Sequence, residues 1–177
     1  AGCTIVLKPA EDTPLSILYA AQLFKEAGFP DGVVNFVPGY GDKAGHALVT
    51  HKDVSKVAFT GSTNTGRNIM KEAAEDIKSI TLELGGKSPA VVLEDADLDA
   101  GLEGILDGTM YNSGQNCSAT TRVYVHRNIY DEVIDALKKK AEEITVGDGL
   151  DEKTDIGPLV SEKQLDTVLG YIEKGKE

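Results

Sequence analysis

The sequence has 177 residues, of which 41% are hydrophobic, enough for a packed core and too many for a disordered chain. Its net charge of −11 provides no basic stripe for a phosphate backbone and argues against a nucleic-acid partner. No apolar run approaches the roughly 18 residues that span a bilayer, and no secretory signal is recognisable. We therefore expect a cytoplasmic protein with no membrane partner; the mitochondrial matrix is the alternative compartment.

The N-terminal segment predicts a strand followed by a helix. Residues 3–8 are short, apolar and β-rich, as in a strand buried on both faces. The helix spans 13–30, with Thr13 as its cap and Pro14 at its first position, and Gly28 and Pro30 end it. Its expected buried face consists of Ile17, Ala20, Ala21, Phe24 and Ala27.

Strand and helix signals continue to alternate up to residue 84. Strands are predicted over 33–37, 56–60 and 79–84. A short helix over 44–50 lies between the first two, and a helix running through Ala73 lies between the last two. This alternation predicts an α/β fold with a parallel sheet.

The segment "GGKSP" (85–89) is expected to interrupt the pattern, so we place a domain boundary near Gly85 and Gly86, dividing the chain into 1–85 and 86–177. A strand and a helix running to Gly114 follow it. A strand over 120–126, an amphipathic helix over 130–144 and a last helix around 165–172 complete the chain.

Two glycine-rich turns follow predicted strands. "GYGDKA" (39–44) fits the dinucleotide fingerprint G-x-G-x-x-A, but no acidic residue follows at the usual distance, and a plain turn is favoured. "FTGSTNTG" (59–66) joins a strand to a helix, so its N–H groups and Ser62 lie at a helix N-terminus, where an anion is favoured. Pyrophosphate binding and a structural turn both remain open for this segment.

Glu83 ends an apolar strand directly before two glycines. A carboxylate in this position is ordinarily solvated or paired with a nearby lysine. The sharper interpretation is a general base, made more basic by partial burial.

Cys117 lies in the polar run "YNSGQNCSATTR" and is one of only two cysteines, the other being Cys3. Such low cysteine use fits a reducing compartment with both thiols free. No histidine or cysteine lies at ligand spacing, so we expect no metal site. The absence of a nearby histidine also argues against a Cys–His hydrolase. A structural thiol and a nucleophile held near backbone N–H donors remain open.

Together, "LKPAE" (7–11), "FTGSTNTG" (59–66), "LELGGKSP" (82–89) and "GQNCSA" (114–119) resemble, in order and spacing, the NAD(P)-dependent aldehyde dehydrogenase superfamily. The likeness continues through 147–164 and so covers essentially the whole chain. It implies a partial Rossmann-like parallel-sheet cofactor domain over 1–85, followed by part of an α/β catalytic domain over 86–177.

The resemblance also implies roles for the candidate catalytic residues. Cys117 would attack a small-molecule aldehyde to form a thiohemiacetal, and hydride transfer to nicotinamide would leave a thioester. Glu83 would activate the water that releases a carboxylic acid, with support from Lys87. In relatives that pass the acyl group to coenzyme A the glutamate is often substituted, so Glu83 favours the hydrolytic form.

The cofactor implied by the resemblance is NAD. Lys8 and Glu11 would contact the adenosine ribose, and the Glu11 carboxylate would repel the extra phosphate of NADP. Leu84 would lie behind the nicotinamide, and Gln164 near the distal ribose. The remaining residues implied in cofactor binding are Gly41 and Gly45 on the adenine side, and Phe59, Thr60, Gly61, Ser62 and Gly66 around the pyrophosphate.

Family segments that would flank this chain, Pro-Trp-Asn before it and Glu-x-Phe-Gly-Pro after it, are not in the sequence. We therefore expect an internal fragment, inactive when isolated, of an enzyme that forms a homo-oligomer (dimer or tetramer). The alternatives are a CoA-acylating relative, a non-catalytic α/β binding module in which Cys117 is merely packed and, more remotely, a thiol hydrolase or esterase.

Overall fold

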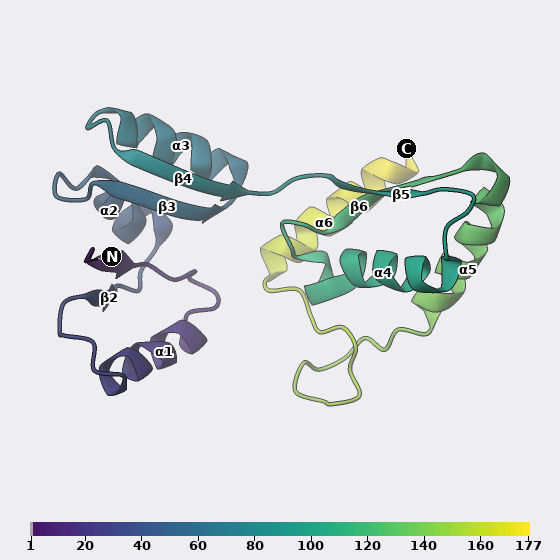
Figure 1. Cartoon of the computed structure of the whole chain (residues 1–177), viewed down its shortest axis with the longest axis horizontal. Coiled ribbons are helices and arrows are strands. Elements are labelled where there is room, and N and C mark those ends of the chain that lie inside the picture. The colour runs from purple at the N-terminus through teal and green to yellow at the C-terminus, as the bar shows by residue number, and fades with distance from the viewer. Residues whose placement is uncertain (1) are drawn as a thin grey trace. The chain divides into compact units, whose positions relative to one another are not determined.

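The computed structural model describes residues 2–177, which form two compact units with the division between Leu84 and Gly85 (Figure 1). The strands form three separate two-stranded parallel sheets, β1–β2, β3–β4 and β5–β6. The expected α/β class with parallel pairing is confirmed. Within the described residues, however, no hydrogen-bonded ladder joins the pairs into one larger sheet.

The first sheet of the N-terminal unit pairs β1 (Ile5–Leu7) with β2 (Val34–Phe36), and α1 (Leu15–Glu26) connects them. The predicted capping of α1 is wrong. The N–H of Leu18 donates to the carbonyl of Pro14 at 3.0 Å, which makes Pro14 the N-cap residue, and no side chain caps the helix. Ala27 follows the last helical residue and is exposed, not buried as expected.

The second sheet of this unit pairs β3 (Lys56–Gly61) with β4 (Ser79–Leu84). The connecting helix α3 (Thr63–Ala74) covers one face, and its buried residues Ile69 and Ala73 pack with Val49 of α2 (His46–Thr50). A π-helical turn, Gly41–Gly45, precedes α2. The Val57, Phe59, Ile80 and Leu82 side chains complete this core from the sheet. Alternate residues of β3 and β4 therefore face α3, as a half-buried sheet requires.

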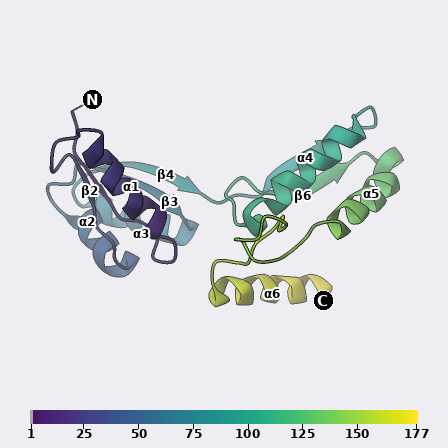
Figure 2. The same cartoon turned by 90° about the horizontal axis from the view of Figure 1, so that it is seen from below.

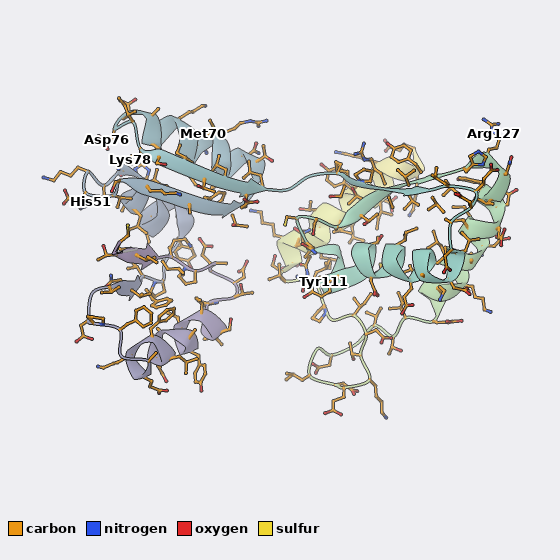
Figure 3. The ribbon with its side chains drawn as sticks, in the orientation of Figure 1. His51, Met70, Asp76, Lys78, Tyr111 and Arg127 are labelled. Carbon is orange, nitrogen blue, oxygen red and sulfur yellow. The ribbon has the colours of Figure 1, made fainter. Side chains whose placement is uncertain are left out.

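Lys78, the residue directly before β4, connects the start of this strand to the segment before β3. Its side chain is only 2% exposed, its Nζ lies 3.2 Å from the Asp76 carboxylate, and it donates a hydrogen bond to the carbonyl of His51 (Figure 3). An ammonium group removed from water is tolerated because these oxygens surround it.

The C-terminal unit is built on β5 (Ser88–Val92) and β6 (Thr120–Val125), with α4 (Leu98–Met110) and α5 (Tyr130–Glu142) packed on them. Its core consists of Val92, Leu102, Ile105 and the fully buried Val133. The helix α6 (Glu162–Lys176) runs apart from α4 and α5 (Figure 2). No helix in residues 2–177 combines the length and apolar character needed to cross a bilayer.

Two predicted boundaries in this unit are wrong. "GGKSP" (85–89) interrupts the strand–helix alternation only as far as Lys87, since β5 begins at Ser88. Pro89 is tolerated within the strand because β5 pairs with another strand on one side only. The helix predicted to run to Gly114 ends at Met110 because Asn112 and Ser113 adopt the left-handed conformation, with φ of 53° and 58°.

Candidate active site and cofactor-binding residues

Cys117 lies at a central position of a tight turn that directly precedes β6. The N–H of Ala119 donates to the carbonyl of Asn116 at 3.1 Å and closes the turn, and the buried Ala119 fixes its downstream end. The Cys117 side chain is exposed and its thiol is free, as is that of Cys3. Cys3 belongs to the N-terminal unit and Cys117 to the C-terminal unit.

The polar groups of the turn are arranged around Asn116. The Asn116 Oδ1 accepts hydrogen bonds from the N–H and the hydroxyl of Ser118, each at 3.3 Å, and lies 3.7 Å from the Cys117 Sγ. Within residues 2–177, the backbone N–H groups of Asn116 and Cys117 donate no hydrogen bond to a protein acceptor. An accessible thiol and unpaired N–H donors thus occur in one short turn.

Glu83 is placed on β4, paired with Thr60 of β3. Its side chain is exposed, which contradicts the expected partial burial. The reason is strand alternation: Leu82 and Leu84 face α3, so Glu83 must face the opposite side of the sheet. Glu83 belongs to the N-terminal unit, whereas Cys117 and the exposed Lys87 belong to the C-terminal unit.

The predicted ribose-binding residues Lys8 and Glu11 lie close together. The Lys8 Nζ is 3.5 Å from the Glu11 carboxylate and donates to the carbonyls of Pro9 at 2.6 Å and Gly39 at 3.0 Å. The N–H of Gly41 donates to the Glu11 carboxylate. Two loops are thereby joined, one after β1 and one after β2.

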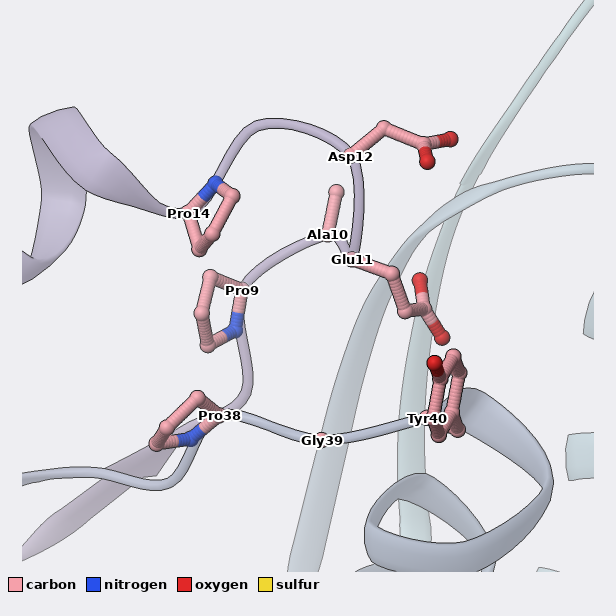
Figure 4. A pocket seen from close by; sticks show the side chains of 8 residues that line it. All are labelled: Pro9, Ala10, Glu11, Asp12, Pro14, Pro38, Gly39 and Tyr40. Atoms are coloured by element: carbon pink, nitrogen blue, oxygen red, sulfur yellow. The ribbon is translucent and has the colours of Figure 1, made fainter. Parts of the chain in front are cut away.

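The glycines predicted on the adenine side lie beside this pair. A Cβ at Gly41 would meet the Glu11 carboxylate at 3.4 Å, and one at Gly45 would meet the Lys8 side chain at 3.7 Å. Next to them is an open pocket of about 240 Å³, where Glu11 extends toward Tyr40 and Asp12 points away (Figure 4). Tyr40 could not be identified from the sequence, because an exposed aromatic residue in a turn has no characteristic spacing.

The pKa of the Glu11 carboxyl is lowered from its ordinary value of 4.5. The largest cause is the hydrogen bond from its own backbone N–H, followed among the lowering contributions by the N–H of Gly41 and the charge of Lys8. Desolvation raises the pKa and is second in size to the first of these causes, but the net change is a lowering. Glu11 is therefore held as a carboxylate.

The turn before α3 has the predicted helix-terminus geometry. Ser62 is the N-cap, and its Oγ accepts a hydrogen bond from the N–H of Thr65 at 3.2 Å. Gly66 is buried, and a Cβ there would come within 2.9 Å of Leu84. Gly61 and Thr60 are exposed, with the Phe59 ring directly beneath Gly61. Gly66 and Leu84 thus contribute to the packing of α3 on β4.

Gln164 lies at the start of α6 in the C-terminal unit, where its N–H donates to the Ser161 Oγ at 3.3 Å.

The structure brings the predicted cofactor-binding residues of the N-terminal unit together in two groups. One group consists of Lys8, Glu11, Gly41 and Gly45, and the other of the residues from Phe59 to Gly66 with Leu84. Among residues 2–177 there is no cluster of His, Cys, Asp or Glu side chains suited to a metal ion.

Parallel strand pairs joined by helices define an α/β protein. The glycine-containing turn at the N-terminus of α3 is of the type that holds dinucleotides in such proteins. Comparison with known proteins identifies the family within this class. The sequence model of the aldehyde dehydrogenase family matches residues 1–177, and the chain belongs to that family.

Several relatives cover almost all of the chain. The Bacillus subtilis protein DhaS is 56% identical over 176 residues, which are 99% of this chain and 36% of that protein. Betaine aldehyde dehydrogenase of Brucella ovis is 51% identical, with the same shares covered. The solved NAD+ complex of an aldehyde dehydrogenase from Bacillus cereus has a TM-score of 0.97 at 64% identity, covering 99% of this chain and 36% of that one. The chain thus spans about 36% of the length of these relatives.

Proposed function

We propose that, in the full-length protein, this chain supplies the nucleophile, the general base and cofactor contacts for NAD-dependent oxidation of a small-molecule aldehyde to a carboxylic acid. The observation that carries the proposal is the exposed Cys117 thiol in a turn with unpaired N–H groups at Asn116 and Cys117. Family membership and the relatives named aldehyde dehydrogenases support it.

The turn suits the first chemical step. The Cys117 thiolate attacks the aldehyde carbon, a C–S bond forms, and the carbonyl electron pair moves onto oxygen. Backbone N–H groups stabilise such an oxyanion, and loss of one donor from an oxyanion hole typically costs about 100- to 1000-fold in rate. NAD, when bound, would supply the hydride acceptor that this oxidation needs, and Cys117 would then hold the acyl group as a thioester.

Glu83 is proposed to complete the reaction. Its carboxylate takes a proton from water, the hydroxide equivalent adds to the thioester carbonyl, and the Cys117 thiolate leaves as the acid is released. An exposed carboxylate can reach water without rearrangement of β4. Lys87 is proposed to assist this proton transfer.

Lys8 and Glu11 fit the hydroxyl groups of an adenosine ribose, because they offer a donor and an acceptor 3.5 Å apart. Gly41 and Gly45 leave room beside this pair, since neither carries a side chain. The Glu11 carboxylate disfavours a 2′-phosphate, so NAD is the proposed cofactor over NADP. The relatives include both kinds: a solved E. coli enzyme at 44% identity is described as NADP dependent.

The remaining cofactor contacts are proposed from the family resemblance. The turn from Phe59 to Gly66, with Ser62 as its cap, is proposed to hold the pyrophosphate at the N-terminus of α3. Leu84 is proposed to lie against the nicotinamide, and Gln164 near its ribose. The N-terminal unit would then be part of the cofactor domain, and the C-terminal unit part of the catalytic domain.

We further propose that the chain acts as part of a cytoplasmic homo-oligomer and does not turn over aldehydes by itself. Its two free thiols fit a reducing compartment. Its length, 36% of that of its relatives, is the basis for expecting no activity of residues 1–177 alone.

Two variants of the full-length protein and one control variant test the function. Cys117→Ser should abolish aldehyde oxidation, whereas Cys3→Ser, which removes the other exposed thiol, should leave the rate unchanged. Glu83→Gln should let the acyl group accumulate, seen by mass spectrometry as a mass increase on Cys117. Full activity of Cys117→Ser would refute the assignment of the nucleophile.

A further inference from the structure

Three successive residues before the cysteine turn have left-handed backbone conformations: Asn112, Ser113 and Gly114, with φ of 53°, 58° and 73°. This conformation is unfavourable for serine and less so for asparagine, and two such residues in succession persist only where surrounding contacts impose them. Here it ends α4 and redirects the chain into the Cys117 turn. The contacts of this segment therefore determine where the turn lies.

Those contacts lead to one segment of the C-terminal unit, Gly157 to Val160. The Ser113 hydroxyl donates to the carbonyl of Gly157 at 2.7 Å, and the N–H of Val160 donates to the Gln115 Oε1 at 2.9 Å. The residues lie 44 and 45 positions apart in the chain, so these are tertiary contacts.

Gln115 uses both ends of its amide. While its Oε1 accepts from Val160, its Nε2 donates to the carbonyl of Asn112 at 3.0 Å, and its backbone N–H donates to the same carbonyl at 3.1 Å. The Asn112 side chain donates in return to the carbonyl of Gln115 at 3.2 Å. The Gln115 side chain therefore supports both the left-handed segment 112–114 and its contact with Val160.

The segment that forms these bonds, through the Gly157 carbonyl and the Val160 N–H, follows directly after a residue that is itself held in place. Val146 and Ile156 form a parallel bridge, and the N–H groups of Gly147 and Ile156 donate to the carbonyls of Ile156 and Thr145 at 3.1 Å each. Because Ile156 is held by these bonds, the adjoining segment 157–160 provides a fixed point to which the Cys117 turn is attached.

From this geometry we infer that Ser113 and Gln115 are positioning residues, which fix the Cys117 turn against the segment 157–160 and so set the place of the thiol. The inference rests on the proposed function for its effect on catalysis. Its structural content, the placement of the Cys117 turn, does not depend on that function.

The test uses Ser113→Ala and Gln115→Met in the full-length protein, because both keep side-chain size nearly constant while losing the tertiary bonds. Each should lower kcat about tenfold and leave KM nearly unchanged, since a small misplacement of a reacting group costs rate more than binding. Gln115→Glu retains the acceptor for Val160 and should be less impaired than Gln115→Met. The matched control is Thr167→Ala, which removes a hydroxyl-to-carbonyl bond within α6.

A second readout is independent of the reaction. The iodoacetamide alkylation rate of Cys117 is measured relative to that of Cys3 in the same molecules. Ser113→Ala and Gln115→Met should lower this ratio about threefold or more, because a loosened turn no longer holds the sulfur beside its N–H groups. Thr167→Ala should leave it unchanged.

The outcomes separate the two hypotheses. If Cys117→Ser keeps its activity, the proposed function fails and positioning is judged by alkylation alone. If both folded variants match Thr167→Ala in alkylation ratio, the positioning inference is overturned, even when Cys117 proves essential. Should Gln115→Met not fold, Ser113→Ala decides the question by the same criterion.

Discussion

Glu11 is the residue whose environment most clearly departs from that of an ordinary surface carboxylate. Its pKa is lowered by hydrogen bonds from two backbone N–H groups and by the Lys8 charge. A carboxylate with a lowered folded-state pKa contributes stability above its ordinary value of 4.5, and this contribution is lost as the pH falls through the folded value.

Replacing Glu11 by Gln should therefore reduce stability at neutral pH and have no such effect at a pH below the folded pKa. The loss should stay below about 1 kcal/mol, because the side chain is 39% exposed and its ion pair is screened by water. Urea unfolding of parent and variant over a series of pH values falling from 7 measures how the difference in stability changes. A loss of stability that stays the same across the series would contradict the charge-based explanation.

The same residue should decide cofactor choice. Glu11→Gln removes the negative charge proposed to oppose a 2′-phosphate while Lys8 stays in place, so the ratio of kcat/KM for NADP to that for NAD should rise about tenfold or more. Asp12→Asn is the matched control, because Asp12 neighbours Glu11 but points away from Tyr40 (Figure 4). An unchanged ratio in Glu11→Gln would remove Glu11 from cofactor selection.

At the residue scale, short sequence motifs indicate which residues are candidates but not what surrounds them. Glu11 and Cys117 lie in such motifs, and their roles stay predictions. The exposure of Glu83 was mispredicted, because burial follows from which strand face α3 covers. Ser113 and Gln115 could not be assigned a role, since their partners lie in a remote segment of the chain.

At the scale of elements, strand positions were predicted well because apolar β-rich runs extend over whole strands, as in 79–84, which coincides with β4. Helix ends were predicted poorly. The end of α4 depends on Asn112 and Ser113, which turn left-handed before the glycine at 114 that was predicted to end the helix. The start of α1 depends on which carbonyl accepts the first helical hydrogen bond. The separation into strand pairs could not be predicted, because alternation indicates strands but not the ladders between them.

The packing of α3 on β4 makes a prediction about Gly66. An added Cβ would come within 2.9 Å of the Leu84 side chain, whereas one at Gly101, in α4, would meet nothing within 4 Å. Gly101→Ala should stabilise the protein by about 0.5–1 kcal/mol through helix propensity. The free energy of unfolding of Gly66→Ala should be about 1–3 kcal/mol lower than that of Gly101→Ala, because the added methyl group overpacks the contact with Leu84. Chemical unfolding of both variants measures this difference, and equal stabilisation would show that α3 can shift freely.

At the scale of the whole molecule, each unit has a hydrophobic core built only from its own residues. Val49, Ile69 and Ala73 form one core, and the other surrounds Val133. Since neither cluster includes a residue of the other unit, the described chain should consist of two separately stabilised parts.

Val133→Ala tests this independence. Val133 is fully buried, so its truncation should cost about 2 kcal/mol through lost transfer energy and a cavity. Val91→Ala, at a position 68% exposed in the same unit, should change stability by less than about 0.5 kcal/mol. Hydrogen exchange followed by mass spectrometry should show faster exchange in β5, α4 and α5 of Val133→Ala, with α3 and β4 unchanged. Faster exchange in all these elements would mean that the two cores unfold as one cooperative unit, because only shared cooperativity would transmit the loss at Val133 to α3.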